Sequence, residues 1–168
     1  NYTEHLVALP NLGCFYQPHS VVAIPPDLGA LGIKDDRPLL LCCGTPFKYL
    51  PRHDPVLVRI ARELRSCQLV FFDYTTVQLS DKLKLRIKRV FERDGLDFAR
   101  HVVFVPWQSR AHFYGLMRRA DVFLDTIGFS GFNTAMQAVE SGLPIVASEG
   151  RFMRARLASG ILKRMGLP

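Results

Sequence analysis

Five short apolar runs, each separated from the next by a stretch with helical spacing, constrain the fold of this chain more than any other feature. Each run is short enough for one strand, and its apolar residues are continuous rather than alternating. Continuous runs are typical of strands that are buried on both faces of a parallel sheet. The runs cover residues 38–45, 68–74, 101–107, 121–126 and 143–148. Their alternation with helical patterns predicts an α/β fold, a Rossmann-like parallel sheet with helices on both faces.

Polar residues that favour helix starts stand between the runs. Asp54 is the expected N-cap of the first helix, Ser80 of the second and Ser109 of the third, because their side chains accept from free N–H groups of a first turn. Two further helices are expected over residues 132–141 and 151–165. Each strand is thus followed by a helix, as the connections of a parallel sheet require.

The first 35 residues differ from the remainder of the chain. They contain four prolines and short apolar pieces without helical spacing, which are typical of strand-like or extended segments. Residues 27–38, with two glycines and several charges, are expected to form a linker. We therefore divide the chain into a leading part, residues 1–35, and one domain, residues 36–168, that is long enough to bury its own core.

Charge and hydropathy narrow the classes of partner. The net charge of +7 suits a nucleic acid, a membrane surface or a phosphate-bearing ligand. The basic residues are spread through helical patterns at 82–89 and 151–164, which favours solvated helix faces over a nucleic-acid groove. No apolar stretch approaches the roughly 20 residues that a membrane span needs. We therefore expect neither a nucleic-acid partner nor a membrane span. A small ligand that carries phosphate is the remaining explanation for the positive charge.

The four cysteines show no C-x-x-C spacing, and two of them fall inside an apolar run. They are Cys14, Cys42, Cys43 and Cys67. This arrangement favours buried free thiols over disulfides, and hence a reducing, cytoplasmic location.

The loop between the fourth run and the next helix, residues 127–134, is the strongest candidate for a ligand site. In open parallel sheets, ligands bind beyond the carboxyl ends of the strands. Gly128 and Gly131 allow tight backbone geometry, and the start of the following helix offers free N–H groups and a positive dipole end to a diphosphate. The side-chain donors of the loop are Ser130, Asn133 and Thr134. Gln137 lies one turn further on, within reach of a ribose hydroxyl; ordinary capping of a glycine-rich helix start is the alternative.

The loop after the first run, residues 44–53, lies at the same edge of the predicted sheet. Its Lys48 is a candidate to neutralise a phosphate that the helix dipole balances only in part. The alternative is an exposed surface lysine.

The loop after the third run, residues 106–112, is the next along that edge. Backbone groups near Gln108 are candidates to read the edge of a base, and Trp107 is a candidate to shield it. Arg110 and His112 fall in the first turn of the following helix, and a plain surface histidine is the alternative for His112.

Several motifs with other chemistry are absent. The chain has no G-x-G-x-x-G, no G-x-x-x-x-G-K-[ST], no Asp-x-Asp and no H-x-x-x-H, so neither a dinucleotide, a P-loop nor a metal site is expected. Residues 128–132 nearly match the G-x-S-x-G elbow of serine hydrolases, with Ser130 as the nucleophile. However, the acid and histidine of such enzymes follow the serine, and here no Asp or His follows Ser130.

The sequence of residues 121–168 resembles the C-terminal catalytic region of O-linked N-acetylglucosamine transferases and their bacterial SPINDLY-like relatives. The resemblance is strongest from Leu124 to Val146, which reads L-D-T, then G-F-N-T, then G-L-P-I-V. Residues 43–55 resemble the loop that carries a phosphate-contacting lysine in this family, and residues 2–18 resemble the end of its N-terminal catalytic domain.

The resemblance implies the C-terminal half of a two-domain GT-B catalytic region, usually found behind tetratricopeptide repeats. Such enzymes move a sugar, commonly N-acetylglucosamine, from a UDP-sugar to Ser or Thr hydroxyls of proteins, without a metal or other cofactor. Residues 1–35 would then be the end of the N-terminal catalytic domain and a linker, and residues 36–168 the nucleotide-sugar-binding domain.

On this resemblance, Lys48 stabilises the leaving diphosphate. The residues expected to meet the nucleotide are Gly44, Thr45, Trp107, Gln108, Ser130, Gly131, Phe132, Asn133, Thr134 and Gln137, with Arg110 and His112 as further candidates. The chain by itself is expected to bind nucleotide weakly and to transfer nothing, because the acceptor site belongs to the other domain. A non-enzymatic nucleotide-binding module and the serine hydrolase remain the alternatives.

Overall fold

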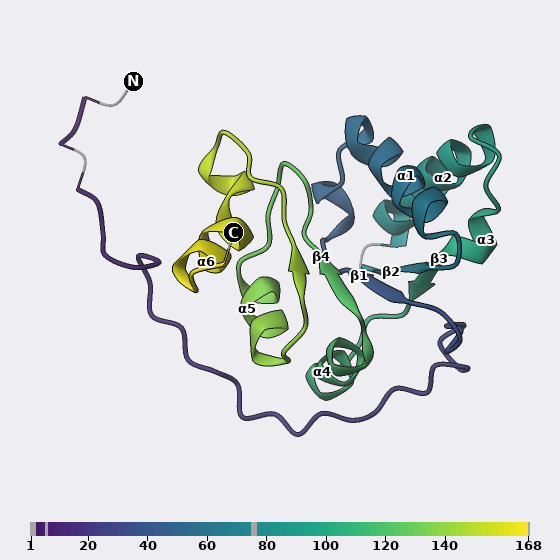
Figure 1. Ribbon diagram of the computed structural model, residues 1–168, viewed down its shortest axis with the longest axis horizontal. Coiled ribbons are helices and arrows are strands. Elements are labelled where there is room, and N and C mark those ends of the chain that lie inside the picture. The colour runs from purple at the N-terminus through teal and green to yellow at the C-terminus, as the bar shows by residue number, and fades with distance from the viewer. Residues whose placement is uncertain (1–2, 6, 75–76, 168) are drawn as a thin grey trace.

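The computed structural model describes residues 3–5, 7–74 and 77–167. Its centre is a sheet of five parallel strands in the order β3-β2-β1-β4-β5, which confirms the predicted α/β architecture (Figure 1). The strands are β1 (Leu39–Cys42), β2 (Gln68–Phe72), β3 (Val102–Val105), β4 (Val122–Leu124) and β5 (Ile145–Val146). Every strand lies within one of the five predicted apolar runs.

The strand order reverses at β1. The chain builds β1, β2 and β3 in one direction and then returns to place β4 on the other side of β1, with Leu41 paired to both Val70 and Phe123. β1 and β4 are therefore neighbours although about 80 residues separate them. The carboxyl ends of β1 and β4 form a topological switch point, where open α/β sheets bind ligands.

Helices cover both faces of the sheet, as expected (Figure 1). Successive residues of a strand point to opposite faces, so Leu40 of β1 joins one core and Leu41 the other. The helices are α1 (Asp54–Leu64), α2 (Val77–Arg93), α3 (Phe98–His101), α4 (Arg110–Arg119), α5 (Asn133–Glu140) and α6 (Leu157–Arg164). The first core includes residues of α1 and α2, and the second includes residues of α4, α5 and α6.

Some predicted helix boundaries are wrong. Helix α2 begins at Val77 rather than after Ser80, whose hydroxyl instead accepts from the backbone N–H of Tyr74 at 2.8 Å. His53 occupies the N-cap of α1, and the buried Asp54 is the first helical residue and pairs with Arg86. In both cases the side chain that local capping rules assign to a helix end makes a different contact. Ser80 bonds the loop before α2, and Asp54 forms an ion pair with Arg86 of α2.

Two further helical details differ from the prediction. A short helix, α3, precedes β3, and the side chain of Asp97 caps it by accepting from the N–H of Ala99 at 2.9 Å. The expected last helix at 151–165 is divided into a 3-10 turn at Met153–Ala155 and α6. Ser109, in contrast, caps α4 as predicted.

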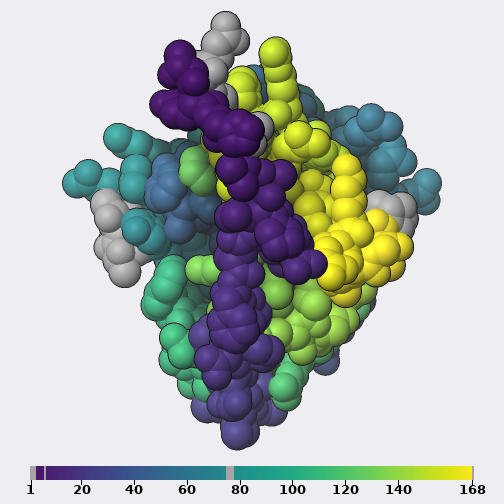
Figure 2. All heavy atoms as spheres, turned by 90° about the vertical axis from the view of Figure 1, so that its left-hand side faces the viewer, coloured from purple at the N-terminus to yellow at the C-terminus, as the bar shows by residue number. Residues whose placement is uncertain are grey.

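Before β1, the described N-terminal residues form no strand and cross the outside of the domain as an extended segment (Figures 1 and 2). The N–H of Ile24 donates to the carbonyl of Ala111 at 3.1 Å. Gly115 of α4 faces the Ile24 carbonyl so closely that a Cβ there would come within 1.8 Å of its oxygen. The segment is therefore packed onto α4, and of the two predicted alternatives, strand-like or extended, the extended one is confirmed.

The described cysteines are all free thiols, as expected. Cys42 and Cys67 are buried as predicted, Cys43 is half-buried, and Cys14 is exposed, so the prediction of burial is wrong for Cys14. Among the residues that the structure describes, no helix combines the length and apolar character needed to cross a membrane.

Candidate functional site

The loops after β1 and β4 touch at the switch point. A Cβ on Gly44 would meet the Thr126 hydroxyl oxygen at 2.2 Å and the Tyr49 ring at 3.1 Å. The N–H of Gly44 also donates to the phenol oxygen of Tyr49 at 3.1 Å. Only a residue without a side chain fits between these two groups, so Gly44 sets how closely the β1 loop approaches the β4 loop.

Asp125 organises the loop between β4 and α5. Its buried carboxylate accepts from the hydroxyl of Ser130 at 2.5 Å and from the N–H of Gly131 at 2.8 Å. Burial raises the pKa of Asp125, and these hydrogen bonds and the charge of Lys48 oppose that shift. Asp125 is the central residue of the L-D-T motif, but neither its type nor its position in the sequence indicates that it organises a loop.

Helix α5 starts from this fixed loop with an open end. Its N-cap is Phe132, and no side chain caps the first turn. Thr134 is close to the loop, since a Cβ on Gly131 would lie 2.4 Å from its hydroxyl oxygen. The first turn of α5 therefore presents Asn133 and Thr134 next to uncapped N–H groups, an arrangement suited to an anion.

Lys48 reaches the same place from the β1 loop. Its Nζ lies 4.9 Å from the centre of the Phe129 ring, in the loop before α5. Burial lowers the pKa of Lys48, while the negative charge of Asp125 acts in the opposite direction. Lys48 is thus a half-buried cation held over the β4–α5 loop, which distinguishes it from a fully solvated surface lysine.

Thr45, beside Lys48, has an unsatisfied polar atom. Its hydroxyl oxygen is buried and has no hydrogen-bond partner among the residues that the structure describes. Buried hydroxyls of this kind are uncommon, and one next to a ligand site is a candidate to bond a ligand.

A cavity of about 380 Å³ opens beside these loops. This volume is within the range of small-molecule sites. Its lining residues are Cys43, Phe72, Trp107, Gln108, Ser109, Arg110, Phe113, Thr134 and Gln137. Five of them were predicted from the loops at 106–112 and 127–134 and from α5: Trp107, Gln108, Arg110, Thr134 and Gln137. The tertiary structure thus brings the loop after β3 and the first turns of α5 to one cavity.

Three apolar residues line the cavity although their sequence patterns do not indicate it. Cys43, Phe72 and Phe113 form the wall of the cavity, and each belongs to a pattern that also describes core residues. No residue type or spacing separates a cavity wall from a core in a single sequence.

Two predicted residues have other roles in the described geometry. The ring Nδ1 of His112 lies 2.8 Å from the hydroxyl of Ser109, and His112 does not line the cavity. Ser130 is 2% exposed; its hydroxyl donates to Asp125 and accepts from the N–H of Ala158 at 2.8 Å. Because this buried hydroxyl already donates one hydrogen bond and accepts another, it holds the loop onto α6 and is not placed to attack a substrate. The support for the hydrolase is thereby removed.

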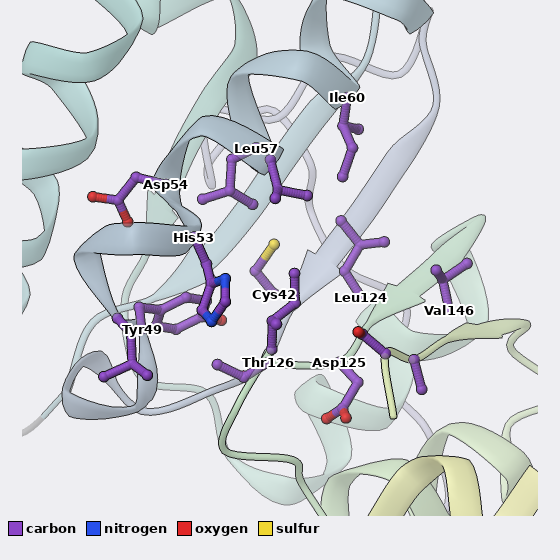
Figure 3. A pocket seen from close by; sticks show the side chains of 15 residues that line it. Cys42, Tyr49, His53, Asp54, Leu57, Ile60, Leu124, Asp125, Thr126 and Val146 are labelled. Atoms are coloured by element: carbon purple, nitrogen blue, oxygen red, sulfur yellow. The ribbon is translucent and has the colours of Figure 1, made fainter. Parts of the chain in front are cut away.

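A second cavity, of about 330 Å³, lies on the α1 side of β4 and β5 (Figure 3). Leu57 and Ile60 of α1 face Leu124 and Val146 across it. None of the predicted nucleotide-binding residues lines it. Over the described part of the chain, no group of three His, Cys, Asp or Glu side chains is close enough to hold a metal ion.

Comparison with known proteins places this geometry in a fold class. No protein-family model and no curated protein sequence matches the chain. Among solved structures, a point mutant of the Thermobaculum terrenum O-GlcNAc transferase matches with a TM-score of 0.70 and 26% identity. The match covers 87% of this chain and 28% of that transferase, so the chain spans less than a third of its structural relative.

Trehalose-6-phosphate synthases share the fold at lower identity. One matches with a TM-score of 0.52 and 14% identity, over 86% of this chain and 40% of the synthase. A second, from E. coli and bound with UDP-2-fluoro glucose, matches with a TM-score of 0.50 and 14% identity, over the same shares of the two chains. The chain is thus a Rossmann-like α/β region with the GT-B glycosyltransferase fold, similar to part of an O-GlcNAc transferase.

Proposed function

We propose that the chain is the donor-binding domain of a glycosyltransferase that moves a sugar, N-acetylglucosamine, from a UDP-sugar to Ser or Thr hydroxyls of proteins. The observation that carries this proposal is one cavity that Trp107 and Gln108 line together with Thr134 and Gln137 of α5. Lys48 lies over Phe129, in the loop that leads into α5. The T. terrenum relative is an O-GlcNAc transferase, and the E. coli relative binds a UDP-sugar; both support a donor of this kind.

The diphosphate lies at the start of α5 in this proposal. The donors that we assign to it are the uncapped N–H groups of α5, the hydroxyls of Thr45 and Thr134 and the ammonium of Lys48. When the bond to the sugar breaks, negative charge grows on the diphosphate, and fixed donors stabilise the transition state more than the ground state. Two phosphate charges also raise the pKa of Lys48 again, which keeps it charged during transfer.

The nucleoside occupies the cavity. The side-chain amide of Gln108 already donates to the carbonyl of Pro106 at 2.7 Å, so in this proposal its backbone groups bond the base edge. Trp107, with 63% of its surface exposed, lines the cavity, and in this proposal it shields the base. Gln137 lies at the ribose, where its amide bonds a hydroxyl, and Arg110 adds positive charge at the wall.

The complete transferase includes parts beyond this chain in our proposal. An N-terminal catalytic domain supplies the acceptor site, tetratricopeptide repeats belong to the full chain, the enzyme works in the cytoplasm, and no metal ion takes part. The relative in T. terrenum is more than three times as long as the stretch that matches, which supports a larger protein. We expect this chain alone to bind the donor and to transfer no sugar.

Calorimetric titration of the chain with UDP, UDP-N-acetylglucosamine, GDP and uridine tests the donor site. Lys48→Ala is expected to weaken UDP binding by about tenfold to a hundredfold, because a hydrogen bond to a charged group contributes about 1.5–3 kcal/mol. The affinity for uridine, which lacks phosphate, is expected to change little.

Lys84→Ala is the matched control for that experiment. Lys84 also lies over an aromatic ring, 5.8 Å from the centre of Phe104, but on α2 and outside the cavity. Equal UDP affinity in the wild type, Lys48→Ala and Gln137→Ala would refute the site. A preference for GDP over UDP would leave a nucleotide site and exclude the uridine donor.

A further inference from the structure

Glu140 is the last residue of α5, and its carboxylate joins α5 to two other parts of the chain. One oxygen accepts from the hydroxyl of Tyr114 in α4. The other accepts from the backbone N–H of His19, 121 residues away in the N-terminal segment, at 3.1 Å. Burial and the hydrogen bond to Glu140 raise the pKa of Tyr114, so its phenol stays protonated and remains a donor. Two helices and the N-terminal segment therefore meet at one side chain.

A glutamate is unfavourable at this end of a helix. The carbonyl end of the helix dipole is negative and repels a carboxylate. The last turn of α5, all of which the structure describes, contains no basic residue to offset this repulsion. The two donors that stabilise the Glu140 carboxylate both come from outside the helix. The carboxylate is thus explained by its tertiary contacts and not by the stability of α5.

Further contacts attach the N-terminal segment on both sides of His19. The rings of Tyr16 and His19 pack edge to face with their centres 6.3 Å apart, and the hydroxyl of Tyr16 is buried. On the other side, the N–H of Ile24 donates to the carbonyl of Ala111 in α4. The segment thus lies along α4 and the end of α5, on the side of the domain that Figure 2 shows.

The two helices that meet at Glu140 also line the nucleotide cavity. Phe113, the neighbour of Tyr114 in α4, is one lining residue. Gln137, which lies three residues before Glu140 on the same side of α5, is another. The contact between Tyr114 and Glu140 therefore joins α4 to α5 about one helical turn from the residues that line the cavity.

We propose that Glu140 is a positioning residue that couples attachment of the N-terminal segment to the affinity of the cavity for nucleotide. With the segment attached, both oxygens of Glu140 are bonded and α4 and α5 keep the separation that the nucleotide needs. Coupling between two binding events is reciprocal, so a bound nucleotide also holds the segment in place. The identity of the ligand rests on the proposed function, whereas attachment of the segment through Glu140 does not.

UDP titration and hydrogen exchange of the same chain test both directions of the coupling. Trp107 is the single tryptophan of the chain and lines the cavity, so its fluorescence reports UDP binding, which calorimetry checks. The hydrogen-bonded amides of His19 and Ile24 report attachment of the segment. In the wild type, saturating UDP is expected to slow exchange at both amides.

Glu140→Ala is expected to break the coupling. Without UDP, the variant should exchange faster at His19, because the acceptor of that N–H is lost. Its UDP affinity should be about threefold to tenfold lower than that of the wild type, and UDP should no longer slow exchange in the segment. A merely structural role of Glu140 would not remove this effect of UDP on the segment.

Two further variants locate the effect. Tyr114→Phe keeps the ring but loses the hydroxyl that bonds Glu140, so its UDP affinity should also fall, and its effect should not add to that of Glu140→Ala. Glu92→Ala is the matched control, because Glu92 also lies in the last turn of a helix but pairs with Lys88 on the surface of α2. Thermal unfolding checks that each variant folds, and Tyr114→Phe decides if Glu140→Ala does not.

Unchanged UDP affinity in the folded Glu140 and Tyr114 variants would overturn the proposal. A loss of the same size in Glu92→Ala would also overturn it, because any glutamate near a helix end would then have this effect. If the wild type binds UDP but UDP leaves exchange at His19 and Ile24 unchanged, the coupling is wrong and the proposed function stands. If the wild type does not bind UDP, the proposed function and the coupling fall together.

Discussion

The hydroxyl of Ser130 donates to the carboxylate of Asp125 across 2.5 Å, and this contact fixes the loop from which α5 begins. The same carboxylate accepts from the N–H of Gly131, and the Ser130 hydroxyl accepts from Ala158 at the start of α6. One buried group thereby connects β4, α5 and α6. The open end of α5 stays in position without any capping side chain of its own because this network holds the loop.

Replacement of Asp125 tests this role. Asp125→Ala leaves the hydroxyl of Ser130 and the N–H of Gly131 buried without their acceptor, and each unsatisfied group costs about 1–3 kcal/mol. We expect a loss of about 2–4 kcal/mol in the free energy of unfolding in urea. Asp125→Asn, which keeps one acceptor oxygen, should lose less. Asp36→Ala, at an exposed ion pair, is the control and should change little; equal stability of both alanine variants would contradict the scaffold role.

The charge of Lys48 gives UDP binding a pH dependence. Burial lowers the pKa of Lys48 in the free protein, so the ammonium is lost at a lower pH than that of an ordinary lysine. Binding of a diphosphate needs the charged form. UDP affinity should therefore be highest below the pKa of Lys48 and should fall as the pH rises through that pKa. Calorimetry across the alkaline range measures this fall.

Lys48→Arg provides the matched test of that profile. A guanidinium stays protonated over the whole range, so the variant should retain its UDP affinity at the pH where the wild type loses it. Lys84→Arg should reproduce the wild-type profile, because Lys84 lies outside the site. If the UDP affinity of Lys48→Arg falls at alkaline pH by as much as that of the wild type, the pH dependence belongs to another group.

The approach of the β1 and β4 loops depends on Gly44. In Gly44→Ala the new Cβ would lie 2.2 Å from the Thr126 hydroxyl oxygen and 3.1 Å from the Tyr49 ring, so the loops must separate. We expect a loss of about 1–3 kcal/mol in stability and weaker UDP binding. The double variant Gly44→Ala with Thr126→Ala removes the nearer atom and should recover part of the loss. No recovery would show that Thr126 is not the limiting contact.

The packing of the N-terminal segment depends on another glycine. Gly115→Ala would place a Cβ 1.8 Å from the backbone oxygen of Ile24, which cannot move aside like a flexible side chain. The segment should therefore leave α4 locally, with faster hydrogen exchange at Ile24 and faster proteolysis near it. Gly160→Ala in α6 has open space for the new Cβ and should leave the segment protected. Unchanged exchange in Gly115→Ala would contradict this contact.

Local patterns predicted most elements of this fold. The apolar runs located all five strands, and the spacing at 132–141 located α5 to within one residue at each end. Ser109 was predicted to cap α4 and does so by accepting from the N–H of His112. These features depend on a few neighbouring residues, and short-range signals of that kind are readable in one sequence.

The candidate site was predictable in part. Trp107, Gln108 and Thr134 follow strand ends, and parallel sheets bind ligands beyond the carboxyl ends of their strands, so these residues were predictable. The role of Ser130 was not readable, because its partners Asp125 and Ala158 come together only in the folded chain. The same limit applies to Ser80, whose hydroxyl bonds a loop rather than the helix that follows it.

The sequence by itself determined the number, direction and approximate limits of the strands, because continuous apolar runs separated by helices have few alternatives to a parallel sheet. Only the tertiary structure decided that β4 pairs with β1. Strand pairing is a choice among similar apolar surfaces, and non-local packing of the helices on both faces selects one order. That order places Lys48 over Phe129. The candidate site is therefore a product of strand order.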